Sequence, residues 1–126
     1  MQKKHFIPFL IVASMCVGCN QEEKSDLTDN PLIGAYNTPF DVPPFDKIKD
    51  EHFRPAFDEA LRQHNLEIDS IANNEEDANF PNTIFALEKA GGLLKKVSII
   101  FYNLNSAHTN DTIQAIAKDM APKLSA

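Results

Sequence analysis

The chain has 126 residues, of which 43% are hydrophobic and 24% charged, and 12 basic against 18 acidic side chains give a formal net charge of −6 at pH 7. These values fit one soluble domain at most, and the negative charge disfavours binding to the phosphate backbone of a nucleic acid. Both cysteines, Cys16 and Cys19, lie in an N-terminal hydrophobic stretch, so the rest of the chain cannot form a disulfide, a thiolate metal site or a cysteine nucleophile.

The N-terminus has the layout of an export signal. Residues 2–5 form a short positive region, and an apolar run with two interruptions follows over residues 6–17. This run would span about 18 Å as a helix, whereas a bilayer core of about 30 Å needs around twenty residues. We therefore predict a cleaved signal peptide over residues 1–18.

The end of the apolar run resembles a bacterial lipoprotein box. Gly18 places a small residue directly before Cys19, and the chain turns polar at once over residues 20–26. The usual leucine three positions before the cysteine is replaced by Cys16. The resemblance implies acylation of Cys19, and hence export and a lipid anchor in the bacterial cell envelope, periplasmic or associated with the outer membrane. An ordinary cleaved signal without lipid is the alternative, and Cys16 is the weaker acylation site because Met15 is bulkier than Gly18.

Residues 19–45 are predicted to be a lipid-anchored flexible tether followed by an extended arm. The chain is polar from Asn20 and then rich in proline, and it shows neither helical nor strand periodicity up to Phe45.

Helical periodicity begins near residue 46. Side chains recur at intervals of three or four residues, as in an amphipathic helix, at Phe53, Phe57, Leu61, His64, Ile68 and Ile71. Because Pro55 cannot donate a backbone hydrogen bond, we expect the regular helix to begin there, after an entry turn over 49–54, and to stop at Asn73.

A second helix is predicted to start at Pro81. Its apolar stripe comprises Ile84, Leu87, Gly91, Leu94, Ser98, Phe101 and Leu104, and Phe85, Leu93, Ile99 and Ile100 widen the apolar face. A face this wide predicts a helix that is buried on more than one side. The adjacent Gly91 and Gly92 leave two interpretations open, which are a continuous helix that packs closely or bends there and a helix that is broken there.

A turn over residues 105–110 precedes the third predicted helix, which Thr109 or Asn110 can cap. One face carries Ile113, Ile116, Ala117, Met120 and Leu124. Pro122 is expected to kink this helix. Since no strand pattern appears, we predict an all-α fold, a helical fragment of about three helices over residues 46–126, preceded by the signal peptide and the extended Pro-rich arm.

Residue types that carry catalysis or bind metals are not arranged as such sites require. The four histidines, His5, His52, His64 and His108, include no pair at the four-residue spacing of a zinc helix, and we expect His52 and His64 to be solvated or capping. No serine lies in a Gly-x-Ser-x-Gly setting, and the acids at 58–59 and 75–77 are expected to be solvated. We therefore assign no catalytic, cofactor-binding or metal-binding residue.

Four blocks resemble the N-terminal segment of the peptidyl-dipeptidase and oligopeptidase A group, which are zinc metallopeptidases related to thimet oligopeptidase. The blocks are NTPFDVPPFDKIKDEHFRPAFDEAL (37–61), FPNTIFALEKAGGLL (80–94), NLNSAHTND (103–111) and APKLS (121–125). The resemblance implies that residues 46–126 are the N-terminal helical part of a larger peptidase domain, truncated here. It also implies a zinc ion held by a His-Glu-x-x-His helix outside this chain, and short peptides as substrates.

The leading hypothesis is thus the N-terminal, non-catalytic part of an exported zinc metallopeptidase of the peptidyl-dipeptidase or oligopeptidase type, forming part of the wall of its substrate channel. This chain alone is expected to be inactive, because it lacks His-Glu-x-x-His. The alternatives are a stand-alone small helical lipoprotein that acts as a binding or scaffolding module, and a decayed or truncated gene product without activity.

Overall fold

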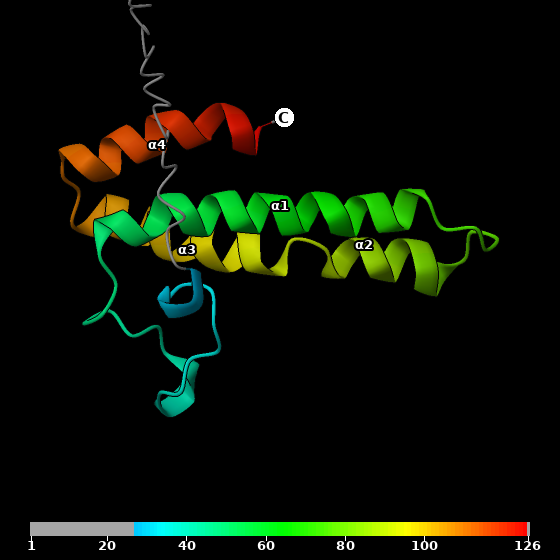
Figure 1. Ribbon diagram of the computed structural model, residues 1–126, viewed down its shortest axis with the longest axis horizontal. Helices are drawn as coiled ribbons and strands as arrows, with labels where there is room; N and C mark the ends of the chain where they lie inside the picture. Colours follow the sequence, from blue (N-terminus) through cyan, green and yellow to red (C-terminus); the bar gives the residue numbers. More distant parts are fainter. Residues whose placement is uncertain (1–26, 126) are drawn as a thin grey trace, which may run out of the picture.

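A long helix, α1 (Phe53–Ala72), lies antiparallel to a second helical stretch in the computed structural model, which describes residues 27–125 (Figure 1). The second stretch consists of a π-helical segment, η4 (Phe80–Phe85), the short α2 (Ala86–Lys89) and α3 (Gly92–Ala107). A last helix, α4 (Asp111–Leu124), packs on α1 and α3. Three short 3-10 turns precede α1, namely η1 (Leu27–Asp29), η2 (Pro39–Asp41) and η3 (Asp50–His52). No strand forms between residues 27 and 125, which confirms the predicted all-α fold.

The core lies where α1, α3 and α4 meet. The ring of Phe101 packs edge-on against Phe53 and Phe57, with ring centroids 5.1 and 5.2 Å apart, and such pairs add stabilisation beyond the apolar area that they bury. The buried apolar side chains are Leu32, Phe53, Ala56, Phe57, Ala60, Val97, Ile100, Phe101, Ile113, Ile116 and Met120. The apolar periodicity of the first and third predicted helices therefore identified the faces that form this core.

The arm contributes to the core, which its sequence does not indicate. Leu32 is fully buried, and Asn30 fixes its position by accepting a hydrogen bond from the Leu32 backbone N–H (3.0 Å) and donating one to the His52 carbonyl (2.9 Å). Within residues 27–48 the arm contains 3-10 turns and no α-helix. It is nevertheless packed against the helices.

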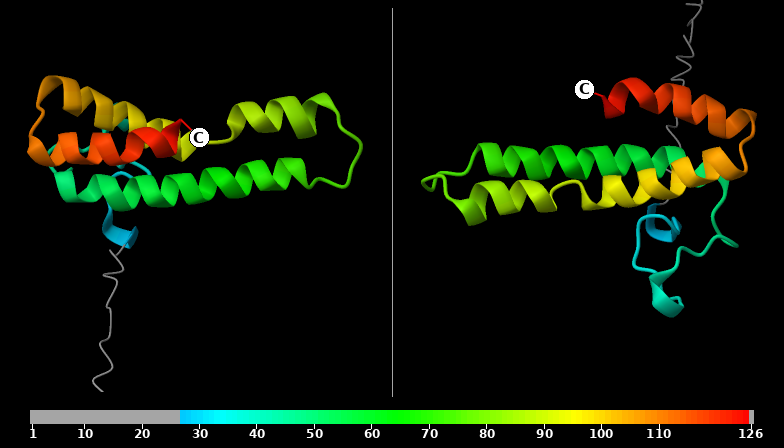
Figure 2. Two further views of the ribbon diagram at one scale, coloured as in Figure 1. Left: turned by 90° about the horizontal axis from the view of Figure 1, so that it is seen from above. Right: turned by 180° about the vertical axis from the view of Figure 1, so that it is seen from behind.

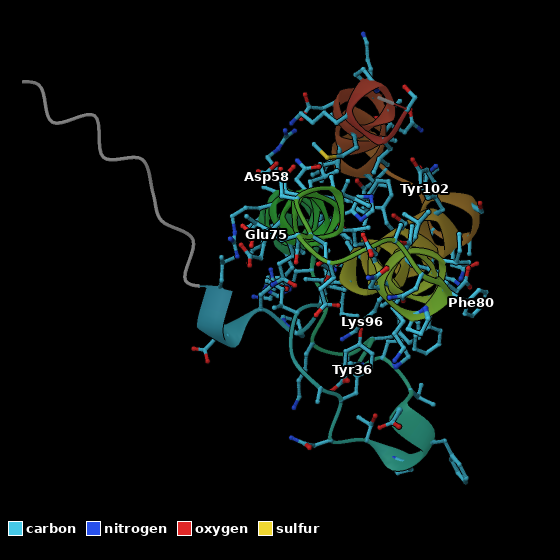
Figure 3. The ribbon with its side chains drawn as sticks, turned by 90° about the vertical axis from the view of Figure 1, so that its right-hand side faces the viewer. Tyr36, Asp58, Glu75, Phe80, Lys96 and Tyr102 are labelled. Atoms are coloured by element: carbon cyan, nitrogen blue, oxygen red, sulfur yellow. The ribbon has the colours of Figure 1, made fainter. Side chains whose placement is uncertain are left out.

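A second contact fastens the arm to α3. The Lys96 ammonium lies 3.9 Å from the centroid of the Tyr36 ring and donates a hydrogen bond to the Gly34 carbonyl (2.6 Å), and Figure 3 shows Tyr36 and Lys96 side by side. Desolvation by burial lowers the pKa of Lys96 and raises that of Tyr36. The cation–π contact and the carbonyl hydrogen bond compensate the ammonium for part of its lost hydration.

The first helix starts earlier than predicted. It begins at Phe53, two residues before Pro55, and follows the η3 turn, which lies within the expected entry turn. Pro55 occupies the third helical position, where a backbone N–H has no intrahelical partner in any case. The missing N–H therefore carries no penalty there, and the predicted start at Pro55 is wrong.

The second predicted helix is broken, so the continuous interpretation is wrong and the alternative is confirmed. It starts at Phe80, beside Pro81, where Asn79 and Asn82 cap each other's backbone N–H groups at 2.8 and 2.9 Å. The break lies at Gly91, which has a φ of +77°. Beyond it, α3 continues to Ala107, so the turn predicted over residues 105–110 is shorter than expected.

The far end of the α1 and α2–α3 pair extends beyond α4 (Figures 1 and 2). There, the last turns of α1 lie beside η4 and α2, and α4 covers only the end of the pair nearest the core. In the part of the chain that the structure describes, no helix is both long enough and apolar enough to cross a membrane.

Candidate functional site

The three histidines within residues 27–125, His52, His64 and His108, have different surroundings. The Nδ1 atom of His52 accepts a hydrogen bond from the Lys49 backbone N–H (3.1 Å), which caps the turn before α1 as predicted. His64 is half-buried against Gly91, and its Nδ1 atom is buried without a hydrogen-bond partner. The prediction that His64 is solvated or capping is therefore wrong. His108 is exposed at the end of α3.

Over residues 27–125 there is no group of three or more His, Cys, Asp or Glu side chains that could hold a metal ion. These residues therefore do not fit the zinc ion that the resemblance implies. The two cysteines, including the predicted lipidation site Cys19, lie outside the described residues.

The neighbouring acids Asp58 and Glu59 do not form a common acid–base pair. The Glu59 carboxylate accepts hydrogen bonds from Arg62 at 2.6 and 2.7 Å and from the Gln63 amide at 2.7 Å. These bonds lower the pKa of Glu59 from 4.5 to about 2, and the hydrogen bonding from Arg62 has the largest effect. Asp58 and Glu75 are exposed, as predicted, and Figure 3 shows both on the same side of the molecule.

A cavity of about 590 Å³ lies between the arm, the start of α1 and α4. Three polar side chains on its wall already have partners. Asp50 accepts a hydrogen bond from the Asn110 amide (2.8 Å), Arg54 forms an ion pair with Asp119, and Asn30 donates to a backbone carbonyl. The bond from Arg54 lowers the pKa of Asp119. These contacts connect the start of α1 with α4, so we assign them a structural role.

The break at Gly91 is shaped by α1. A Cβ atom at position 91 would lie 2.9 Å from the Nδ1 atom of His64, and the left-handed φ of +77° also favours glycine. The Gly91 N–H donates a hydrogen bond of 2.6 Å to the Glu67 carboxylate. Two side chains of α1 therefore hold the point at which the second helical stretch is interrupted.

Exposed apolar side chains gather on the second helical stretch. They form what we call the outer face, which consists of Phe80 (68% exposed), Ile84 (54%), Leu87 (54%), Ile99 (54%) and Tyr102 (41%). Figure 3 shows Phe80 and Tyr102 on one side of the molecule, with Asp58 and Glu75 on the other.

The outer face points away from α1. The partly buried Ala86 of α2 and Ala90, which directly follows α2, line a space shared with the α1 residues Leu66 and Ile71. On α3 the buried side chains are Val97, Ile100 and Phe101. The prediction that this helix is buried on more than one side is confirmed for α3, which packs against α1, α4 and the arm, and is wrong for η4 and α2, which have no buried residue.

Comparison with known proteins finds dipeptidyl carboxypeptidases. The enzyme of Salmonella typhimurium is 42% identical over 100 residues, a match that covers 79% of this chain and 15% of that protein. The dipeptidyl carboxypeptidase of Escherichia coli is 41% identical over 97 residues, which cover 77% of this chain and 14% of that protein. No protein-family profile matches the chain. The expected resemblance to peptidyl-dipeptidases is confirmed, and the chain spans about 15% of the length of the curated relatives it matches.

Proposed function

We propose that this chain, a homologue of dipeptidyl carboxypeptidases over most of its length, is the N-terminal, non-catalytic part of an exported zinc metallopeptidase. The whole enzyme would hydrolyse short peptides, by releasing dipeptides from their C-termini or by cutting them internally. The observation that supports this proposal is the identity of 41–42% over 77–79% of the chain to two proteins with that name. Because the matched segments are only 14–15% of those proteins, the catalytic groups are proposed to lie elsewhere in a longer polypeptide.

The proposed role of this part is structural. Paired helices with a packed core are rigid elements, and rigid elements can hold one wall of a substrate channel in a fixed position. We assign this role to α1 and the η4–α2–α3 stretch, which lie side by side over their whole length. Zinc belongs to the proposal only as a group held by residues outside this chain, because residues 27–125 offer no ligand set for it.

The nucleotide sequence beyond the codon for Ala126 tests this proposal directly. We expect an open frame that encodes His-Glu-x-x-His, and the full product should release a dipeptide from a blocked tripeptide and lose this activity to a chelator. The 126-residue chain should show no activity and no stoichiometric zinc binding by calorimetry. An immediate stop codon would favour the stand-alone helical lipoprotein.

Attachment to the envelope is proposed to occur through Cys19, with Gly18 as the small residue before the cleavage site. The Cys19→Ser variant should lose labelling by a fatty-acid analogue in a Gram-negative host and should move from the membrane fraction to the soluble fraction. Cys16→Ser is the matched control and should remain labelled. The reverse pattern would assign the anchor to Cys16, and an unlabelled parent chain would refute the lipoprotein proposal.

A further inference from the structure

We infer that the outer face is the surface against which the rest of a longer peptidase polypeptide packs. This inference rests on the proposed function, and it adds which side of this segment is internal in the whole protein. The occupant is the part of the same polypeptide that lies outside the segment matched by the relatives.

The first argument is the pattern of apolar exposure. Phe80, Ile84 and Leu87 follow one another at spacings of four and three, and Ile99 and Tyr102 are three residues apart. Each group therefore lies on one side of its helix. All five are at least 41% exposed although they are large and apolar. Single exposed apolar residues are ordinary, but groups of them on one side of successive helices mark an interaction surface.

The second argument is the distribution of charge. Residues 80–102 contain Lys89, Lys95 and Lys96 against Glu88 alone, whereas the whole chain has a formal net charge of −6. Lys96 is held by Tyr36 and Gly34, and Lys89 lies over the Phe85 ring and lines the space shared with α1, so Lys95 is the exposed cation beside the outer face. The complementary surface is accordingly apolar with an acidic border.

The third argument concerns the size of the occupant. The matched segments make up 15% and 14% of the two dipeptidyl carboxypeptidases, so most of each relative lies outside them and is large enough to cover an entire helical face. A second copy of this chain fits less well. A two-fold interface sets a surface against itself, and the stretch over residues 80–102 is net basic in both copies, so a second copy offers no acidic border.

Cysteine accessibility tests the inference. Leu87→Cys and Ile99→Cys probe the outer face, and Asp58→Cys and Glu75→Cys are matched controls on exposed α1 and loop positions. All four are made separately in a Cys16→Ser, Cys19→Ser background, both in the 126-residue chain and in the full-length product of the open frame. Labelling by a water-soluble maleimide is followed at a concentration where the 126-residue chain is monomeric by ultracentrifugation.

We expect Leu87→Cys and Ile99→Cys to label at least about tenfold more slowly in the full-length protein than in the 126-residue chain, since reaction then requires local opening. The two controls should label at similar rates in both proteins. Equal rates for the outer-face cysteines in an active full-length peptidase would overturn the inference and leave the proposed function standing. Slow labelling in the monomeric 126-residue chain would show that the face is already covered within this chain and would also overturn the inference. An immediate stop codon would remove the proposed function and, with it, the proposed occupant.

Discussion

Gly91 combines a positive φ of 77° with a close approach to the ring of His64. An alanine at this position would be strained by its backbone conformation and would also place its Cβ atom 2.9 Å from the Nδ1 atom of His64. Gly91→Ala should therefore lower the free energy of unfolding by about 1–3 kcal/mol. Urea denaturation followed by circular dichroism at 222 nm measures this change.

Gly92 provides the control for the neighbouring glycine. A Cβ atom there meets nothing within 4 Å, and Gly92 is the first residue of α3. Gly92→Ala should be stabilising by about 0.4–1 kcal/mol, because it reduces the conformational entropy of the unfolded chain. If the two alanine variants were equally stable, the constraint at Gly91 would be refuted.

The bonds around Glu59 predict a dependence of stability on pH. Arg62 and Gln63 hold the pKa of Glu59 at about 2 instead of 4.5. A lowered pKa in the folded state stabilises the protein above the unfolded pKa, and this contribution is lost as the pH falls towards 2. Because the Arg62 side chain is 58% exposed, we expect Glu59→Gln to cost only about 0.2–1 kcal/mol at pH 7.

The free energies of unfolding of the parent and Glu59→Gln chains should converge as the pH is lowered from 5 to 3, the interval that approaches the folded pKa of about 2. The exposed loop residue Glu75 supplies a control, and the difference between Glu75→Gln and the parent should not follow this trend. A constant difference for Glu59→Gln across the interval would argue against the ion pair.

The two histidines of α1 and its entry turn show how far single residues could be interpreted from the sequence. The capping role of His52 depends on residues three positions away, so local sequence is sufficient to predict it. The burial of His64 depends on Gly91, which lies in the break between α2 and α3. Spacing along one helix contains no information about that contact, and the prediction for His64 therefore failed.

Helix starts show the same distinction at the scale of the element. The cap at Asn79 follows a rule of local sequence, since a short polar side chain precedes Pro81 at the start of a helical pattern. The start of α1 was misplaced because Pro55 is tolerated within the first turn as well as at its first position. The break at Gly91 could be foreseen only as one of two possibilities, because contacts from α1 decide between them.

The start of α4 gives a prediction that separates two candidate caps. The Asn110 side chain accepts a hydrogen bond from the Ile113 N–H (2.9 Å), whereas the Thr109 hydroxyl donates to Asn105 (3.2 Å). Asn110→Ala should cost about 0.5–2 kcal/mol of stability, and Thr109→Ala should stay within about 0.5 kcal/mol of the parent. Thermal unfolding of both variants distinguishes them.

Asn110 also donates a hydrogen bond to Asp50, so the loss in Asn110→Ala has two sources. Asn110→Ser keeps an acceptor for the cap and removes the bond to Asp50. We expect Asn110→Ser to recover most of the lost stability, because the cap is the larger contribution. If Thr109→Ala lost as much stability as Asn110→Ala, the assignment of the cap to Asn110 would be contradicted.

At the scale of the whole molecule, the apolar residues were identified correctly but their partners were not. Leu32 lies in a Pro-rich segment without periodicity, and its burial follows from the fold of α1, α3 and α4 around it. Ile84, Leu87 and Ile99 have the hydropathy of core residues and are exposed. Hydrophobic patterning predicts which helix faces must be covered, but it does not indicate which segment or partner covers them.

The exposed outer face leads to a prediction for the 126-residue chain in isolation. It should be strongly helical by circular dichroism, bind an apolar dye, and self-associate non-specifically as its concentration rises, since grouped apolar side chains exposed to water favour association. The Ile84→Glu, Leu87→Glu double variant should bind less dye and associate less. Because both side chains are 54% exposed, its free energy of unfolding should stay within about 0.5 kcal/mol of the parent.

Leu66 is equally exposed but lies on α1, outside the outer face, so Leu66→Glu should leave dye binding and association almost unchanged. A parent chain that stays monomeric, binds no dye and melts in one sharp two-state transition would show that its apolar surface needs no further cover.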